Sequence, residues 1–282
     1  MSTKGNGTTL LTYLHPSPIM SFVNNYTAPQ PQPTLPEHEL YGPEPYDINF
    51  AWPLHPESLQ TDRLKIVPFV PRVHAATYWE NVKDNLLVLF RYYPFVPRAL
   101  PEFLVWLELN CRRNPHHLFL AVIDRTRPDP EHPEWGGSLA GAVAIANTAA
   151  GNLTTELGYI IVFPQFHHTH VAKEMVGVML RYVLELPTAS PPGIGFRRVE
   201  WRAHPGNKPS LGLAERMGFK KDGLVKWLWV LPEELTDAGD GCTRPDVFQG
   251  RSGRHTAILS VCWDDWEGGV DEKVKAVLAQ SS

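Results

Sequence analysis

The chain has 282 residues, of which 43% are hydrophobic, and its formal net charge is −4 with acids and bases mixed along its length. This length favours one domain with extensions, and the apolar content is sufficient for a sizeable core. The mixed charge argues against a nucleic-acid partner, because a polyanion needs a basic field. A small anionic ligand stays compatible, since a helix N-terminus binds phosphate without net positive charge.

The three cysteines are Cys111, Cys242 and Cys262. Their wide spacing fits neither a disulfide framework nor a zinc motif, so we expect two buried thiols, one loop thiol and no metal. No apolar run is long enough for a bilayer, and no basic segment precedes an apolar one at the N-terminus. We therefore expect no membrane partner, no signal peptide and a cytoplasmic location.

Residues 1–57 hold ten of the 27 prolines, several of them alternating within 29–33. Proline removes a backbone donor and interrupts helices and central strands, which predicts an arm that is extended or partly disordered. Aromatic residues such as Tyr41 and Trp52 suggest that the second half of the arm packs on the following domain. A polyproline ligand for another protein is the alternative.

The pattern changes at residue 61, and hydrophobic periodicity predicts the elements that follow. In chain order they are a strand at 64–69, helices at 72–85 and 98–113, strands at 118–123, 138–146 and 156–163, a helix at 171–186, a strand at 196–204, a helix at 207–217, strands at 223–231 and 255–263, and a terminal helix at 270–280. Loops at 125–137 and 232–253 join strands. This order predicts a mixed α/β layer arrangement.

Four segments carry a family resemblance. The most specific is 198–219, with Arg198-Val199-Glu200-Trp201-Arg202-Ala203, then Asn207, Ser210 and Gly218-Phe219; the others are Thr61-Asp62-Arg63-Leu64 with Tyr93-Pro94-Phe95, Phe103 and Trp106; Glu156-Leu157-Gly158-Tyr159; and His255-Thr256-Ala257 with Trp266. Together they resemble the GNAT acyltransferase superfamily, in particular its RimJ/RimL-like branch.

The resemblance implies an α/β (α+β) fold with a GNAT-like, mostly antiparallel central sheet and helices on both faces. It implies an acyltransferase domain at 58–268, between the arm at 1–57 and a C-terminal helix or tail at 269–282. The implied activity is direct transfer of an acetyl group from acetyl-CoA to an amine, either a small molecule or a protein N-terminus. A homodimer is left open.

Two other functions stay open beside this one. The chain could be a degenerate GNAT-like binding module, or an acyltransferase with a different acyl donor or an alcohol acceptor.

The phosphate loop of the superfamily falls on His167, His168, Thr169, His170, Val171 and Ala172, where its usual leading Gln or Arg and its glycine are missing. A loop that runs into a helix N-terminus still supplies N–H donors and a positive dipole end, so we expect these residues to bind the diphosphate of acetyl-CoA. Plain surface or core histidines are one alternative. A metal site is another, although no ligand partner lies at a recognised spacing.

The resemblance also implies that the fourth and fifth strands diverge and that the pantetheine arm pairs with the backbone of Ile160, Ile161 and Val162. Asn207 is the expected N-cap of the helix at 207–217, and it is also expected to contact the cofactor arm. Tyr92, Tyr93 and Trp106 are expected near the acceptor.

Glu156 is the first candidate for the catalytic base, because it would sit at the cleft end of its strand and act through a water. Glu200 and His204 are alternative bases, and a plain ion-paired carboxylate is the alternative reading of Glu156. Ser210 is the remaining hydroxyl that could protonate the thiolate, since Ala214 stands where the superfamily often has a tyrosine. Ser210 could instead be a helix-start residue that bonds backbone.

Overall fold

The computed structural model describes residues 23–27, 34–241 and 244–279. Met1–Thr34 forms a unit of its own, and Leu35–Ser282 forms a second compact unit, to which everything below refers. The proline run at 29–33 and Cys242 lie outside the described residues.

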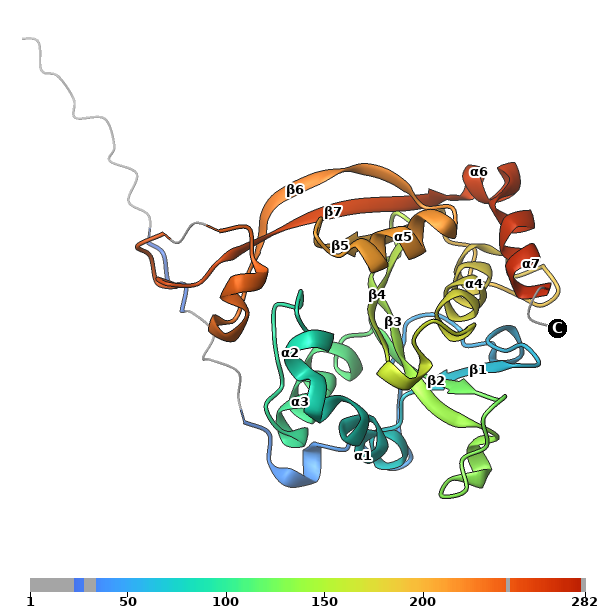
Figure 1. Cartoon of the computed structure of the whole chain (residues 1–282), viewed down its shortest axis with the longest axis horizontal. Coiled ribbons are helices and arrows are strands. Elements are labelled where there is room, and N and C mark those ends of the chain that lie inside the picture. Colours follow the sequence, from blue (N-terminus) through green and yellow to red (C-terminus); the bar gives the residue numbers. More distant parts are fainter. Residues whose placement is uncertain (1–22, 28–33, 242–243, 280–282) are drawn as a thin grey trace, which may run out of the picture. The chain divides into compact units, whose positions relative to one another are not determined.

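The helices and strands of the second unit follow the order expected from the sequence (Figure 1). They are β1 (Leu64–Pro68), α1 (Pro71–Val82), α2 (Leu86–Leu89), α3 (Leu100–Leu107), β2 (Leu118–Asp124), β3 (Ser138–Ala149), β4 (Thr154–Val162), α4 (Val171–Leu184), β5 (Arg198–Ala203), α5 (Lys208–Arg216), β6 (Lys220–Val230), β7 (Gly253–Cys262), α6 (Trp263–Asp265) and α7 (Asp271–Ala279).

The strands form one sheet in the order β1-β2-β3-β4-β5-β7-β6. Neighbouring strands run antiparallel, except that β4 and β5 are parallel. In Figure 1, α1, α2 and α3 lie on one side of this sheet, and α4 and α7 pack together on the other. The predicted mixed, mostly antiparallel sheet with helices on both faces is thereby confirmed.

Several element boundaries differ from the sequence-based expectation. The helix expected at 98–113 is α-helical only to Leu107 and widens into a π-helical turn at Glu108–Arg112. The short helix α2 was not expected. Strands β3 and β4 extend further toward their connecting turn than predicted, to Ala149 and from Thr154. The hydroxyls of Thr148 and Thr155 hydrogen-bond between the two strands at 3.0 Å and hold them together there.

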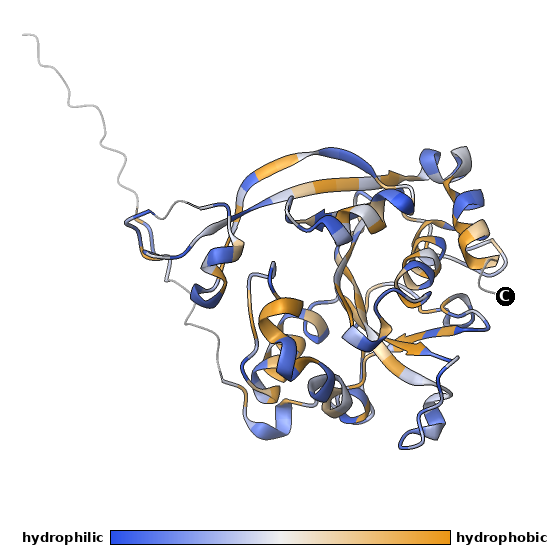
Figure 2. Ribbon diagram, in the orientation of Figure 1, coloured by the Kyte–Doolittle hydropathy of each residue, from blue (hydrophilic) through white to orange (hydrophobic). Residues whose placement is uncertain are grey.

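The core lies between the sheet and the two helix layers, and Figure 2 shows hydrophobic stretches on the central strands and on α2 and α3. Strand β2 is buried along its whole length, as expected of a strand covered on both faces. The segment before β1 adds to this core: the Trp52 ring packs edge-on against Phe196 at 5.5 Å, and the Tyr182 hydroxyl donates to the Pro53 carbonyl at 2.8 Å. The later half of the predicted arm therefore packs on the sheet unit.

Glycine at position 141 allows β3 to approach β4 closely. A Cβ at this position would lie 2.1 Å from the Ile161 carbonyl oxygen, and the backbone of a buried strand cannot shift cheaply. We expect Gly141→Ala to lower the free energy of unfolding by about 1–3 kcal/mol, as overpacking of a core does. Urea unfolding measures this change. Gly151→Ala is the matched control, because nothing lies within 4 Å of a Cβ there, and an equal loss in both variants would contradict the explanation.

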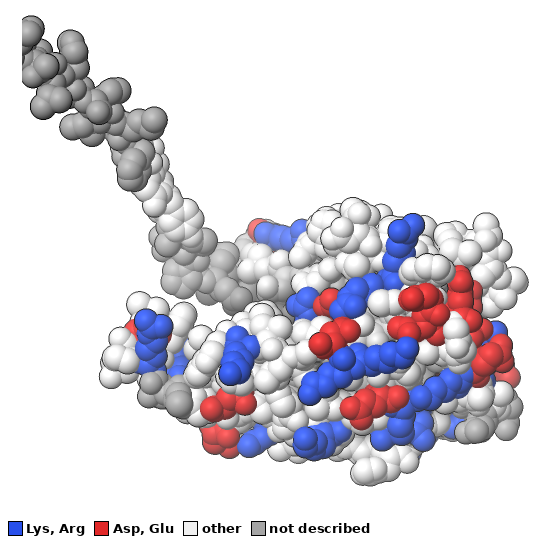
Figure 3. Space-filling view, turned by 90° about the horizontal axis from the view of Figure 1, so that it is seen from above, with Lys and Arg blue, Asp and Glu red and all other residues white. Residues whose placement is uncertain are grey.

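No helix in the described ranges has the length and apolar character needed to cross a bilayer. Figure 3 shows basic and acidic side chains interleaved on the face seen from above, without a field of one sign.

Candidate active site

The N-terminus of α4 presents backbone donors that the protein itself does not use. His170 is the residue before the helix, and its carbonyl accepts the first helical bond, from Glu174 N–H at 3.0 Å. Thr169 holds the turn: its hydroxyl donates to the Phe166 carbonyl at 2.7 Å and accepts from Val171 N–H at 3.3 Å. Within the described residues, no acceptor is found for the N–H groups of His168, Thr169, His170, Ala172 and Lys173.

These free donors lie where solvent and ligands reach them. His167, His168 and Lys173 are exposed, and Ala172 is half-buried. His168 has φ +61°, the left-handed conformation for which glycine is the usual choice. The loop therefore places a histidine at a left-handed position beside unused N–H groups, at the positive end of the helix dipole.

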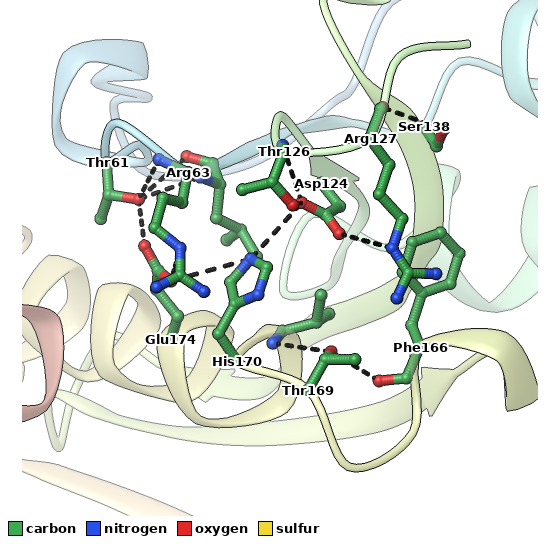
Figure 4. Close-up of polar contacts among 12 residues, drawn as sticks. Thr61, Arg63, Asp124, Thr126, Arg127, Ser138, Phe166, Thr169, His170 and Glu174 are labelled. Atoms are coloured by element: carbon green, nitrogen blue, oxygen red, sulfur yellow. Dashed lines mark hydrogen bonds and ion pairs between the residues drawn. The ribbon is translucent and has the colours of Figure 1, made fainter. Parts of the chain in front are cut away.

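The ring of His170 lies beside two buried carboxylates, Asp124 and Glu174 (Figure 4). Its Nε2 lies 3.4 Å from Asp124 Oδ1 and 3.9 Å from Glu174 Oε2. Arg127 lies 3.7 Å from the second oxygen of Asp124, and Thr61 donates to Glu174. His170 is thus engaged inside the protein, so its backbone N–H, and not its ring, is the group available to a ligand.

The parallel pair β4–β5 opens after three residue pairs. Pairing runs from Thr154↔Arg198 to Glu156↔Glu200, although β4 continues to Val162 and β5 to Ala203. Tyr159, with φ +50°, forms a bulge in β4, and the register with β3 shifts at the same place. The β4 edge beyond Glu156 is therefore free of a strand partner on the β5 side.

Two side chains bond to carbonyls in this part of β4. The Tyr93 hydroxyl donates to Ile160 O at 3.1 Å, and His167 Nε2 lies 2.8 Å from Val162 O. A carbonyl oxygen has two lone pairs, so a bound pantetheine amide could share these acceptors or replace the side chains. The side chain of Ile161 is buried in the core, which leaves its backbone alone for any ligand contact.

Glu156 stands at the point where the two strands part. Its Oε2 accepts a hydrogen bond from the Asn147 side chain at 2.8 Å and lies 3.2 Å from Arg202 Nε. The side chain is 12% exposed, and this burial raises the pKa of the carboxyl above its ordinary value despite the neighbouring Arg202. Glu200 pairs with Arg198 and Arg202, so both predicted carboxylates belong to one ion-pair network.

Helix α5 begins on the β5 side of the site with two of the predicted residues. The Asn207 side-chain oxygen accepts from Ser210 N–H at 3.3 Å, which confirms Asn207 as the predicted N-cap and leaves its amide NH₂ group available. The Ser210 hydroxyl accepts from the Trp201 indole N–H at 3.0 Å, and its own proton has no acceptor in the described part of the chain.

His204 directly follows β5 and belongs to a cluster of polar and aromatic side chains that the sequence had indicated only in part. Its ring stacks on Tyr92 at 4.7 Å, its Nδ1 accepts from Gly206 N–H at 2.9 Å, and its Nε2 lies 3.3 Å from Asp240. Burial lowers the pKa of His204, although Asp240 opposes the shift. Asp240 also bonds to the backbone N–H of His255.

Two of the three aromatic residues expected near the acceptor, Tyr93 and Trp106, lie by the bulge of β4, whereas Tyr92 stacks on His204. The Tyr93 ring stacks on Tyr159 at 6.0 Å, and the Trp106 ring meets Tyr159 edge-on at 5.0 Å.

Among the described cysteines, Cys111 is buried and Cys262 is half-buried, and both are free thiols. Cys262, Asp264 and Asp265 have possible ligand atoms within 4.8 Å of one another. Asp265 pairs with Lys220 and accepts from Cys262 N–H at 3.2 Å, so capping of α6 explains this group.

The sheet opens after one short parallel pairing, and the N-terminus of α4 offers unused N–H donors, as the expected acyltransferase architecture requires. Residues 63–220, more than half of the chain, match the family model described as the acetyltransferase (GNAT) domain. The chain therefore belongs to the GNAT acetyltransferase family, whose general activity is acetyl transfer from acetyl-CoA. No curated protein matches it.

Solved structures share the fold at low sequence identity. A GCN5-related N-acetyltransferase from Brucella melitensis has 24% identity and a TM-score of 0.60, with 79% of this chain and 86% of that one covered. A GNAT-family protein from Chromobacterium violaceum has 18% identity and a TM-score of 0.58, with 77% and 97% covered. RimJ of Mycobacterium smegmatis, solved in complex with CoA-disulfide, has 16% identity and a TM-score of 0.54, with 76% and 88% covered.

Sequence reasoning missed three polar residues of this site: Asp124, Asp240 and Arg254. Asp124 closes a buried strand, and a carboxylate that ends a fully apolar run was the available signal. Asp240 lies in a glycine-rich loop, where no sequence pattern indicated its role.

Proposed function

We propose that this chain is an acetyl-CoA-dependent N-acetyltransferase that transfers the acetyl group directly to an amine, with residues 58–268 as the acyltransferase domain. The observation that carries the proposal is the end of β4–β5 pairing at Glu156↔Glu200, in the same molecule as free N–H groups at 168–173. The unpaired edge of β4 offers backbone groups to a pantetheine arm, and the free N–H groups offer donors to a diphosphate.

The binding roles follow from which groups are free. The loop at 167–172 binds the diphosphate through its backbone, with the exposed His168 ring beside it. The β4 backbone at 160–162 pairs with the pantetheine amides. The free amide NH₂ group of Asn207 is a donor to the same arm.

The chemical roles follow from charge and burial. Glu156 accepts the proton of the acceptor ammonium, directly or through a water, and burial raises the pKa of its carboxyl, which makes it a stronger base than an exposed glutamate. The neutral amine attacks the thioester carbonyl, and a β4 N–H polarises that carbonyl oxygen. As the tetrahedral intermediate collapses, the C–S bond breaks and the nitrogen loses its second proton; the Ser210 hydroxyl, whose own proton is unshared, is the candidate relay that takes this proton and gives one to the leaving thiolate.

An amine acceptor is favoured because carboxylates converge on the site. Glu156 and Asp240 both attract an ammonium group, and Tyr92, Tyr93 and Tyr159 supply apolar surface for the rest of the acceptor. A cytoplasmic location belongs to the same proposal and is supported by the free thiols of Cys111 and Cys262.

The direct test is to incubate the full chain with acetyl-CoA and a panel of small amines and peptides, and to follow thiol release and acetylated product by mass spectrometry. We expect one free CoA thiol for each acetylated amine. Binding of acetyl-CoA without thiol release for any acceptor would instead support the binding-module alternative, which the missing loop glycine favours. Product from alcohols but not amines would support the other alternative.

A further inference from the structure

Arg254 of β7 is a buried cation for which the described residues supply no hydrogen-bond acceptor at Nε. The residue is only 7% exposed, and its Nε is buried with no hydrogen-bond acceptor among the described residues. No carboxylate of the described residues lies within 4.0 Å of its guanidinium nitrogens either. An unpaired buried charge is costly, so such a group is retained where something else neutralises it.

The surroundings of Arg254 belong to the proposed active site. The Tyr93 phenol and the Glu156 and Asp240 carboxylates are close enough to act on its charge, while burial lowers the pKa of the guanidinium. Arg254 in turn acts on His204. Four separate segments thus meet around the Arg254 guanidinium, whose Nε lacks an acceptor in the described residues. They are the loop before α3, strand β4, the end of β5 and the loop after β6.

Strand β6 is deformed beside the same residue. Val225 pairs with Thr256 and Trp229 with Arg254, so residues 226–228 bulge opposite the single residue His255. Within this bulge Trp227 adopts φ +56°, and its N–H donates to His255 Nδ1 at 3.2 Å. Bulges of this kind are common next to active sites, where they re-aim side chains.

We propose that Arg254 binds a carboxylate of the acceptor, and that the substrate is therefore a small amine that also carries a carboxylate, as a free amino acid does. The inference rests on the proposed acetyl transfer and narrows its acceptor class. Arg254 and Glu156 then divide the two charges of a zwitterion: the guanidinium holds the carboxylate in a charge-assisted bond, and Glu156 faces the ammonium whose proton it removes.

The test uses matched acceptor sets on the full chain. Each set contains a free amino acid, its C-terminal amide and the amine that lacks the carboxyl group, for one aromatic and one aliphatic side chain. We expect kcat/KM to be at least about 10-fold higher for the free amino acid than for the other two members. An N-terminal aspartyl peptide amide carries a side-chain carboxylate and no α-carboxylate, so its kcat/KM shows which of the two carboxylates is required.

Variants separate a binding role from a structural one. Arg254→Met keeps the length of the side chain without its charge, and Arg254→Lys keeps the charge without the bidentate geometry. We expect Arg254→Met to lower kcat/KM for carboxylate acceptors about 10-fold more than for the amide and the plain amine, mainly through KM. Arg254→Lys should restore part of the loss. The measurements belong at a pH above the acid limb of the rate, so that Glu156 stays ionised in every variant.

The outcomes distinguish this inference from the proposal beneath it. Calorimetry should give the same acetyl-CoA affinity for wild type and Arg254→Met. Acetylation of all three members at similar kcat/KM, or an equal loss for all three in Arg254→Met, would overturn the carboxylate role while N-acetyl transfer stood. Failure to acetylate any acceptor would overturn the proposed function itself.

Discussion

Glu156→Gln is expected to lower the single-turnover rate of acetyl transfer by about 100-fold or more, because a positioned general base contributes at least that much. The amide keeps the shape of the side chain and its hydrogen bond from Asn147. It cannot accept a proton. Single-turnover mixing measures the chemical step without interference from product release.

The pH dependence of the rate tests the same role of Glu156. A base must be ionised, so the wild-type rate falls as the pH drops through the pKa of Glu156. Burial raises this pKa, and the acid limb should therefore lie above the range of an exposed glutamate. Glu156→Gln should abolish the limb. Glu200→Gln is the control, because Glu200 also pairs with Arg202. The limb should remain in this variant and move to lower pH, since the charge of Glu200 raises the pKa of Glu156. A limb that survives in Glu156→Gln would exclude this residue as the base.

Ala172→Glu is expected to weaken acetyl-CoA binding by about 10-fold or more, equivalent to about 1.4 kcal/mol. Ala172 lies in the first turn of α4 and its N–H is free. A carboxylate there repels a diphosphate, yet it favours the helix by about 0.3–1 kcal/mol through the dipole. The variant should therefore bind acetyl-CoA poorly and unfold no earlier than wild type. Calorimetry and thermal unfolding measure the two effects.

Two comparisons make the Ala172 prediction specific. S-acetylpantetheine lacks the diphosphate, and its KM should be the same for wild type and Ala172→Glu. Ala172→Gly removes only a methyl group and should keep acetyl-CoA affinity. Equal acetyl-CoA affinity in wild type and Ala172→Glu would show that the diphosphate binds elsewhere.

The sequence predicted most of the fold because apolar periodicity records which faces are buried. The alternation in 198–203 and the apolar stripe of 171–184 each match a strand or helix of the structure. Asn207 was identified as a cap because the residue types at a helix start are narrow. The π-helical turn after Leu107 was missed, since it preserves an apolar helical pattern while changing the bonding.

The candidate site was only partly predictable for a different reason. Local chemistry indicated Glu156 and the loop at 167–172, because both belong to short segments with recognisable spacing. The neighbours of these groups come from distant segments. The His170 ring lies beside the Asp124 carboxylate, and Arg254 is close enough to act on the charge of Glu156, which is nearly a hundred residues away in the sequence. Such pairs depend on sheet order, which periodicity alone does not give.

The most direct measurement of the central claim is a crystal structure of the full chain with bound coenzyme A. The diphosphate oxygens should lie within hydrogen-bonding distance of the free N–H groups at 168–173, and the sulfur should reach the parting of β4 and β5 beside Glu156. Coenzyme A bound away from the start of α4, or β4 and β5 paired beyond Glu156↔Glu200 with the cofactor present, would contradict it.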